Sequence, residues 1–324
     1  MHTLTDILNH TKNLFEKENF TFQPEGLYAP IDYTLRLGGK RIRPVMLMIA
    51  NEMFGGNLED VEHAALGIET FHNFTLLHDD LMDKSPIRRG KSTVYRKWNE
   101  NTAILSGDTM FAMAWRFFLR KNHSNLCSIL NCFNDTAIEV CEGQQYDMEF
   151  ETRNDVTINE YLEMIRLKTA VLLAGALKIG GLFANAPTED LEHLYQFGIQ
   201  IGLAFQLQDD LLDTYGDTAT FGKQTGTDIK DNKKTYLYLK ALELATTEQK
   251  SQLQSLFSTT PVNPANKIAK VLDIYNQIGI QSEVEKAINN HFSAAQNELA
   301  AIRISEDKKS TLKSLADTLL RRKK

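Results

Sequence analysis

Residues 61–83 read VEHAALGIETFHNFTLLHDDLMD, and this stretch decides the fold class. Apolar and small residues recur in it at intervals of three and four: Val61, Ala64, Ala65, Ile68, Phe71 and Thr75. That spacing is the period of an α-helix, and residues 191–205 (LEHLYQFGIQIGLAF) repeat it. No segment alternates with a period of two, as exposed strands do. The sequence therefore predicts an all-α protein of long helices joined by short loops.

The composition excludes several classes of function. The chain has 324 residues, 42% of them hydrophobic and 24% charged, which is the balance of a globular protein with a large core. Its net charge of −6 provides no basic field for nucleic acid or an anionic membrane. The three cysteines lack the spacing of a zinc site or a disulfide framework, so reduced thiols in a cytoplasmic protein are expected.

Neither a membrane span nor a domain linker is predicted. The most apolar stretch, residues 170–186, contains Lys178 and is too short to cross a bilayer. The first 20 residues lack the continuous apolar run of a signal peptide. Without a Pro/Gly/Ser-rich linker or a repeat, residues 1–324 are expected to form one domain. The longest polar interruption, residues 216–234, is expected to be a functional loop.

Two aspartate clusters carry the chemistry, DDLMD at 79–83 and DDLLD at 209–213. On a helix the first and last aspartates of each cluster share a face about 6 Å apart, where like charges are destabilising. Carboxylates placed in this way suit Mg²⁺, which bridges protein oxygens to substrate phosphates. A solvated acidic face is the alternative, but two copies in apolar surroundings favour a site that holds a diphosphate through Mg²⁺.

Basic residues that can bind a diphosphate alongside the metal occur in three places: Lys40 and Arg43 in GGKRIRP (residues 38–44), Arg88 with Arg89, and Lys223 with Lys233. The first group follows a glycine turn at the start of a helix, where backbone N–H groups also attract anions. Each group alone also fits a solvated turn or a structural ion pair. Nucleotide hydrolysis is disfavoured, because Gln224 follows Gly222-Lys223 where a phosphate-binding loop needs Ser or Thr.

Taken together, these motifs resemble those of the trans-isoprenyl diphosphate synthases, or polyprenyl synthetases, over residues 35–237. The shared pieces are GGKRIRP at 38–44, His72, DDLMD with RRG at 88–90, GQQYD at 143–147, Lys168-Thr169, FQLQDDLLD at 205–213, Gly222-Lys223, Thr227-Asp228 and Lys233. One departure is Asn232, where many relatives have Gly before the lysine. Lys233 is assigned to the family position, with Lys234 as the alternative.

The resemblance implies a helical bundle around a deep central cavity, usually in a homodimer. It implies head-to-tail 1′-4 condensation of isopentenyl diphosphate with an allylic diphosphate, which is dimethylallyl, geranyl or farnesyl diphosphate. Asp79, Asp83 and Asp209 would ligate Mg²⁺, three ions per site, with Asp80, Asp210 and Asp213 in support. The allylic substrate would be held by Arg88, Lys168, Thr169, Gln206, Lys223 and Lys233, and isopentenyl diphosphate by Lys40, Arg43, His72 and Arg89. For His72 alone, a core histidine is the competing interpretation.

Product length is predicted from the helix before the first cluster. Phe74 lies five residues before Asp79, about 7.5 Å along the axis, and Phe71 lies one turn deeper. In relatives, an aromatic residue at this fifth position limits the product, and Thr75 stands at the fourth position without a second aromatic ring. The pattern is similar to C20 synthases, with C15 next; ordinary core packing of the two rings is the alternative.

Four other functions remain as rivals. A longer-chain synthase would share the reaction but usually has a small residue in place of Phe74. A class I terpene cyclase does not need a second DDxxD cluster or GGKRIRP. A non-catalytic subunit of a heteromeric synthase would be expected to lack an aspartate or Arg88-Arg89, all of which are present. A metal-buffering protein would bind Mg²⁺ without diphosphate.

Overall fold

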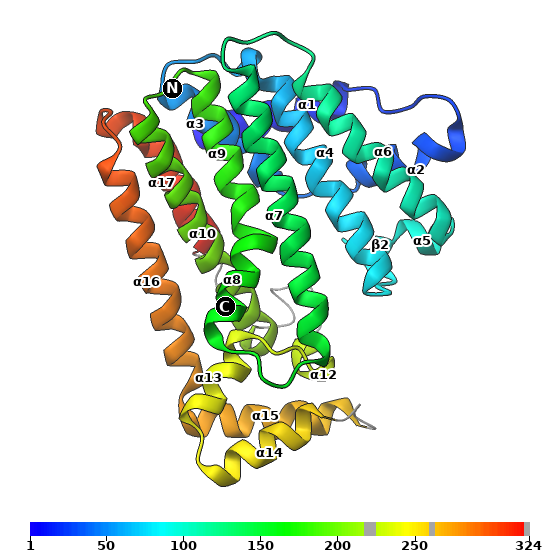
Figure 1. Ribbon diagram of the computed structural model, residues 1–324, viewed down its shortest axis with the longest axis vertical. Coiled ribbons are helices and arrows are strands. Elements are labelled where there is room, and N and C mark those ends of the chain that lie inside the picture. The colour runs from blue at the N-terminus through cyan, green and yellow to red at the C-terminus, as the bar shows by residue number, and fades with distance from the viewer. Residues whose placement is uncertain (217–224, 259–262, 321–324) are drawn as a thin grey trace. The chain divides into compact units, whose positions relative to one another are not determined.

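A computed structural model describes residues 1–216, 225–258 and 263–320 (Figure 1). The described residues are overwhelmingly helical, which confirms the all-α prediction. None of the described helices is long and apolar enough to span a membrane. The chain forms two compact units, and four helices contribute residues to both: α7 (Leu126–Thr152), α9 (Val171–Phe183), α10 (Thr188–Tyr215) and α17 (Glu306–Leu320).

Unit 1 consists of residues 1–134, 175–194 and 303–314. Its central helix is α4, which packs against α3 and lies beside α6 (Figure 1). The apolar positions of α4 recognised in the sequence, among them Ile68 and Phe71, are fully buried. The elements wholly within this unit are α1 (Leu4–Lys17), α2 (Glu25–Arg36), α3 (Ile42–Met53), α4 (Leu58–Met82), β1 (Ile87–Arg88), β2 (Lys91–Ser92), α5 (Val94–Lys97) and α6 (Glu100–Phe118).

The small hairpin β1–β2 was not anticipated from the sequence. Ile87 pairs with Ser92 and Arg88 with Lys91, so Arg89 and Gly90 form a two-residue turn. Their φ values of 52° and 75° are both positive, as a tight hairpin turn of this kind requires. Arginine is not a residue that signals such a turn, which is why the sequence pattern missed it. The turn holds Arg88 and Arg89 directly after the first aspartate cluster.

Unit 2 consists of residues 135–174, 195–302 and 315–324. Within it α13 packs against α16 and α8, and α12 packs against α15. A short π-helical segment, η1, separates α8 from α9 and carries Lys168 and Thr169. The elements wholly within this unit are α8 (Ile158–Ile165), η1 (Arg166–Ala170), α12 (Thr227–Lys230), α13 (Tyr236–Leu244), α14 (Thr247–Phe257), α15 (Pro264–Ile278) and α16 (Ile280–Ala301).

The prediction that residues 216–234 form a loop is wrong for residues 227–230, which form the helix α12. Hydrogen bonds to Asp213 stabilise the start of this helix. The carboxylate of Asp213 accepts hydrogen bonds from the Thr227 hydroxyl and from the backbone N–H of Asp228, at 3.0 Å for the latter, and both donors belong to the first turn of α12. A residue 14 positions earlier therefore stabilises the first turn of this helix. Lys223, also assigned to this segment, lies outside the described residues.

Candidate active site

The first aspartate cluster lies at the C-terminal end of α4. Asp83 is the residue that ends the helix, and its backbone N–H donates to the carbonyl oxygen of Asp79 at 2.8 Å. The last turn of α4 contains no basic residue. Because a helix C-terminus carries a partial negative charge, three acids here are electrostatically unfavourable on their own. A bound divalent cation fits this position and would offset the repulsion.

The middle aspartate of the cluster is engaged within the protein. Asp80 is only 5% exposed, and both of its carboxylate oxygens accept from Arg88 Nε at 2.8 Å. Burial raises the pKa of Asp80, and Arg88 opposes that rise. Arg88 thus joins the hairpin to the end of α4 and lies beside the cluster.

The GGKRIRP turn meets the same hairpin. Arg89 Nη1 donates to the carbonyl oxygen of Gly38. Gly39 has φ +131°, and a Cβ atom there would lie 2.7 Å from Arg89 Nη2. Glycine is therefore needed at position 39 both for its backbone conformation and for the space that the Arg89 guanidinium occupies. The exposed Lys40 follows directly.

The two arginines of the GGKRIRP turn have different surroundings. Arg41 packs over the Phe15 ring, 4.2 Å from its centroid, and donates to the carbonyl oxygen of Leu35 at 3.3 Å, which gives it a structural role. Arg43 Nη1 instead lies 3.0 Å from His72 Nε2 on α4. Arg43, Arg89 and His72, three of the predicted ligands of isopentenyl diphosphate, thus belong to one cluster of unit 1.

A buried acid, Glu69, stands among these cations and was not identified from the sequence. It is 2% exposed and one helical turn before His72. Burial raises the pKa of Glu69, while Arg43 and Arg89 act in the opposite direction. Burial likewise lowers the pKa of Arg43 to about 10, and Glu69 opposes that change. The sequence feature that could have revealed a buried Glu69 is its position directly after Ile68, a core residue of α4.

Aromatic rings pack behind the first aspartate cluster. Phe74 stacks on Phe111 of α6, with ring centroids 5.4 Å apart and planes 21° apart. Phe71 is fully buried and contacts both Phe74, at 5.5 Å, and Phe133, at 5.4 Å. The Thr75 hydroxyl donates to the carbonyl oxygen of His72 at 2.8 Å. Phe111 is a member of this cluster that helical spacing along α4 had no means of revealing.

The second aspartate cluster lies near the C-terminal end of α10, again without a basic residue in the last turn. Asp210 is 5% exposed and accepts from the Tyr161 hydroxyl and from Gln206 Nε2, at 3.0 Å for the latter. Burial, followed by repulsion from Asp228, raises the pKa of Asp210 to about 8. Tyr161 was not recognised in the sequence as a contact of this cluster.

Asp228 adds a further carboxylate to this acidic group. Burial and repulsion from Asp213 raise its pKa to about 7. Within the described residues, no three His, Cys, Asp or Glu side chains converge as a protein-only metal site. Mg²⁺ does not need such a set, because it keeps waters and substrate oxygens among its ligands. Buried carboxylates that repel one another are a suitable environment for it.

Lys168 and Thr169 are presented by the π-helical segment η1. Lys168 Nζ lies 2.6 Å from Asp147 Oδ2, and the Thr169 hydroxyl donates to Gln206 Oε1 at 3.1 Å. Gly143, the first residue of GQQYD, allows α7 to approach η1 closely, because a Cβ atom at this position would lie 2.3 Å from the backbone nitrogen of Lys168. π-Helical turns are common at functional sites. The predicted residues Thr169 and Gln206 are therefore in direct contact with each other.

The choice between Lys233 and Lys234 is clarified by their surroundings. Lys234 Nζ donates to two carbonyl oxygens at the end of α7, Phe150 at 2.8 Å and Glu151 at 2.9 Å. Burial and Asp213 raise the pKa of Asp228, and the positive charge of Lys233 opposes that rise. Asn232 has φ 61°, a left-handed conformation that asparagine tolerates better than most residues, which accounts for Asn at a position where many relatives have Gly.

Residues 24–276 match the family described as "Polyprenyl synthetase". The chain is 36% identical over 300 residues to a short chain isoprenyl diphosphate synthase of Methanothermobacter thermautotrophicus, covering 92% of this chain and 91% of that protein. It is 45% identical over 224 residues to the geranylgeranyl diphosphate synthase of Methanosarcina mazei, covering 68% and 69%. It is 41% identical over 237 residues to the geranylfarnesyl diphosphate synthase of Natronomonas pharaonis, covering 68% and 70%.

Solved structures of prenyl synthases are also similar to this chain. A crystal structure of a geranylgeranyl pyrophosphate synthase matches all of both chains with 41% identity and a TM-score of 0.95. A polyprenyl synthase from Caulobacter crescentus, complexed with calcium and isoprenyl diphosphate, matches 98% of this chain and 96% of that one with 26% identity and a TM-score of 0.88. The all-α fold is that of an isoprenoid synthase. The chain belongs to the polyprenyl synthetase family, and it is a trans-prenyltransferase.

Proposed function

We propose that this enzyme condenses isopentenyl diphosphate head-to-tail with an allylic diphosphate and releases a short trans-prenyl diphosphate, with C20 favoured. The observation that carries the proposal is the placing of aspartate clusters at the C-terminal ends of both α4 and α10, where neither last turn has a basic residue. Bound cations would stabilise helix ends of this kind. A reaction that ionises a diphosphate ester supplies both the need for metal and its further ligands.

Asp79, Asp83 and Asp209 are proposed to bind Mg²⁺, three ions per site. The calcium in the Caulobacter crescentus structure supports a divalent cation in this family. When bound, Mg²⁺ neutralises the diphosphate that leaves the allylic carbon. Asp80 and Asp210 act differently, because both are buried and hydrogen-bonded within the protein. They hold Arg88 and Gln206 in place.

The cluster of Arg43, Arg89 and His72 in unit 1, which we call the arginine cluster, is proposed to hold isopentenyl diphosphate together with Lys40. Arg43 and Arg89 present forked N–H donors that suit phosphate oxygens. Burial, followed by the charges of Arg43, Arg89 and Arg88, lowers the pKa of His72 well below its ordinary value. The imidazole is therefore neutral, accepts from Arg43 through Nε2 and keeps its proton on Nδ1, where it can donate to a ligand.

The allylic diphosphate is proposed to be held by Arg88, Lys168, Thr169, Gln206, Lys223 and Lys233. The basic groups concentrate positive charge on the leaving diphosphate. The oxygen dipoles of Thr169 and Gln206, which contact each other at 3.1 Å, stabilise positive charge on the allylic carbon without attacking it. The isopentenyl double bond then forms the new C–C bond, and the proton lost from the isopentenyl unit passes to the departed diphosphate. No protein nucleophile is required.

Product length is proposed to be set by the Phe71, Phe74 and Phe111 rings. Phe74 and Phe111 stack on each other, and two stacked rings are a larger obstacle to a growing chain than one. Relatives named geranylgeranyl and geranylfarnesyl diphosphate synthases support a short product. Between C20 and C25, the stacked pair favours C20.

We further propose that residues 1–324 form one synthase domain that works as a homodimer in the cytoplasm. Adjacent apolar residues on α6, Ile104 and Leu105, are 46% and 59% exposed. Apolar surface of this kind is commonly buried against a second copy.

Radiolabelled isopentenyl diphosphate tests the proposed reaction. The label is incubated with Mg²⁺ and with dimethylallyl, geranyl or farnesyl diphosphate, and the products are dephosphorylated and separated by length. A series that stops at C20 supports the whole proposal, and one that stops at C25 or beyond retains the reaction and rejects the role of the rings. Absence of incorporation by the folded enzyme contradicts the proposed reaction.

A further inference from the structure

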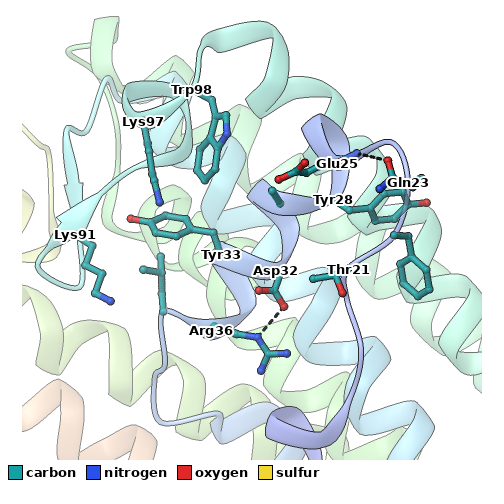
Figure 2. Close-up of a pocket in the computed structure, with 13 residues that line it drawn as sticks. Thr21, Gln23, Glu25, Tyr28, Asp32, Tyr33, Arg36, Lys91, Lys97 and Trp98 are labelled. Carbon is teal, nitrogen blue, oxygen red and sulfur yellow. Dashed lines mark hydrogen bonds and ion pairs between the residues drawn. The ribbon is translucent and has the colours of Figure 1, made fainter.

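A cavity lies in unit 1, apart from the residues assigned to the reaction. Its volume is about 700 Å³, and it is lined on one side by α2 and the preceding residues and on the other by Lys91, Lys97 and Trp98 (Figure 2). That volume is typical of small-molecule sites. None of the residues assigned above to substrate, metal or product length lines it.

The walls of this cavity are continuous with the arginine cluster. Leu37 lines the cavity and directly precedes Gly38, whose carbonyl oxygen accepts from Arg89. On the opposite wall Lys91 lies two residues after Arg89, in the same hairpin. The Tyr33 hydroxyl joins the two walls by donating to the carbonyl oxygen of Ser92 at 2.8 Å. The contact between Arg89 and Gly38 therefore adjoins both walls of the cavity.

Much of the cavity lining is aromatic. Tyr33 and Trp98 make an edge-to-face pair with centroids 5.3 Å apart, and Tyr28 makes another with Phe22 at 5.2 Å. Phe22 is 40% exposed. Rings held in this way present apolar area to a ligand at a small cost in conformational entropy.

The charge in the cavity is unevenly placed. Lys97 Nζ lies 3.9 Å from the centroid of the Tyr33 ring, and Lys91, also exposed, lies on the same side (Figure 2). Asp32 is paired with Arg36 at 2.7 Å. Glu25, the other acid, lies across the cavity beside Gln23 (Figure 2). Lys91 and Lys97 therefore make one side of the cavity cationic, while the rest of the lining is a mixture of aromatic and polar side chains.

We propose that this cavity is a regulatory site for an amphiphilic anion, a diphosphate that carries an apolar chain. Lys91 and Lys97 bind the diphosphate, and the rings of Tyr28, Tyr33 and Trp98 bind the chain. The identity of the ligand rests on the proposed function, because the reaction releases such a molecule, a prenyl diphosphate, as well as inorganic diphosphate by the same turnover. Occupancy shifts the turn and the hairpin that hold Arg89, and so lowers turnover through the differential affinity of the ligand for the two arrangements.

Tryptophan fluorescence tests the site without turnover. Geranylgeranyl diphosphate is added to the metal-free enzyme in excess EDTA, and the Trp98→Phe variant gives the background from Trp115. A saturable change that this variant lacks is expected. Lys97→Gln should weaken binding about tenfold, because a hydrogen bond to a charged group is lost. Lys250→Gln, which makes the same charge change outside the cavity, should leave the affinity unaltered.

Two further ligands decide the chemistry. Inorganic diphosphate and geranylgeraniol should each bind at least tenfold more weakly than geranylgeranyl diphosphate, because each lacks one half of the recognised group. If either binds as tightly as the complete molecule, or if Lys97→Gln binds like the wild type, the proposal is overturned.

Initial rates provide the regulatory readout. Added geranylgeranyl diphosphate should inhibit the wild type more strongly than Lys97→Gln, with equal uninhibited rates for the two. Equal inhibition of both overturns the regulatory role. Failure of the proposed function is distinguishable: it gives no incorporation of isopentenyl diphosphate by the wild type, whereas failure of the cavity proposal gives incorporation without a Trp98 signal.

Discussion

Arg43 Nη1 and His72 Nε2 lie 3.0 Å apart, and this contact determines the state of the histidine. An arginine has no acceptor atom and does not lose its proton in proteins, so His72 Nε2 is the acceptor. Burial and the neighbouring arginines lower the pKa of His72 well below its ordinary value of 6.5. The pair therefore presents two sets of donors, the Arg43 guanidinium and His72 Nδ1–H, without a second buried positive charge.

Replacing His72 should affect one substrate selectively. The His72→Ala variant is expected to raise KM for isopentenyl diphosphate roughly tenfold, because Arg43 loses its partner and the diphosphate loses a donor. KM for the allylic substrate should change little, which steady-state kinetics with each substrate varied in turn will show. His10→Ala, on α1, is the control. An equal rise in both KM values would contradict the assignment of His72 to isopentenyl diphosphate.

The outer aspartates should be essential for turnover but not for folding. Asp79→Ala and Asp209→Ala are each expected to lower kcat by about a thousandfold, through loss of several kcal/mol of charge stabilisation. Each removes a like charge from a helix C-terminus, so thermal stability without metal should be unchanged or higher by about 0.5 kcal/mol.

The readout for metal is the rise in melting temperature that Mg²⁺ and a non-hydrolysable allylic diphosphate analogue produce together. It should be present in the wild type and lost in both variants, since only ligand bound to the folded state stabilises it. Wild-type turnover in either variant would reject the two-cluster mechanism.

The stacked rings should have separable effects. Phe74→Ala and Phe111→Ala each remove one member of the pair at 5.4 Å and are expected to lengthen the product by at least one C5 unit. Phe71→Ala, at a fully buried position, should mainly lower the free energy of unfolding, by about 3–5 kcal/mol. Product analysis and urea unfolding measure the two effects. An unchanged product in both Phe74→Ala and Phe111→Ala would place the limit elsewhere.

The two adjacent lysines form a matched pair of variants. Lys233→Gln should raise KM for the allylic diphosphate roughly tenfold, by loss of a charged ligand. Lys234→Gln should leave KM unchanged and lower the free energy of unfolding by about 1–2 kcal/mol, since its ammonium group binds the carbonyl oxygens of Phe150 and Glu151. The reverse pattern would assign the substrate to Lys234.

Local patterns predicted the helices and the motifs, while contacts between distant residues were beyond them. The period of α4 predicted which residues, such as Phe71, would be buried. It carried no information on Phe111, whose place depends on how α6 packs against α4. The same limit applies to Tyr161, which reaches Asp210 from 49 positions away. Such pairs follow from packing between helices.

Three local features were missed for a different reason. α12 begins where Asp213 accepts from Asp228, and no propensity within four residues predicts that. The hairpin turn contains Arg89 in a left-handed conformation that its residue type disfavours. The π-helical turn at η1 carries Lys168 and Thr169 without a sequence signature. All three lie beside predicted site residues, where local preference is most often overruled by function.

His63 makes stability depend on pH in unit 1. Its ring is 5% exposed, contacts Phe183 at 5.4 Å, and neither ring nitrogen has a hydrogen-bond partner among the described residues. Burial, followed by the nearby Lys121 and Arg120, lowers its pKa from the ordinary 6.5 to about 4. Between pH 6.5 and about pH 4, His63 is therefore protonated in the unfolded chain but neutral in the folded protein. Stability is complete above pH 6.5 and falls between those values, by roughly 3 kcal/mol at most.

The His63→Phe variant keeps a ring against Phe183 and removes the titrating group. Urea unfolding from pH 8 to pH 4 should give a shallower acid decline for this variant than for the wild type, with the difference developing below pH 6.5. Measurements at pH 8, above both pKa values, report the packing change alone and provide the reference for each protein. Parallel pH profiles would show that the folded state protonates His63 as readily as the unfolded chain does, which requires that water reaches the ring.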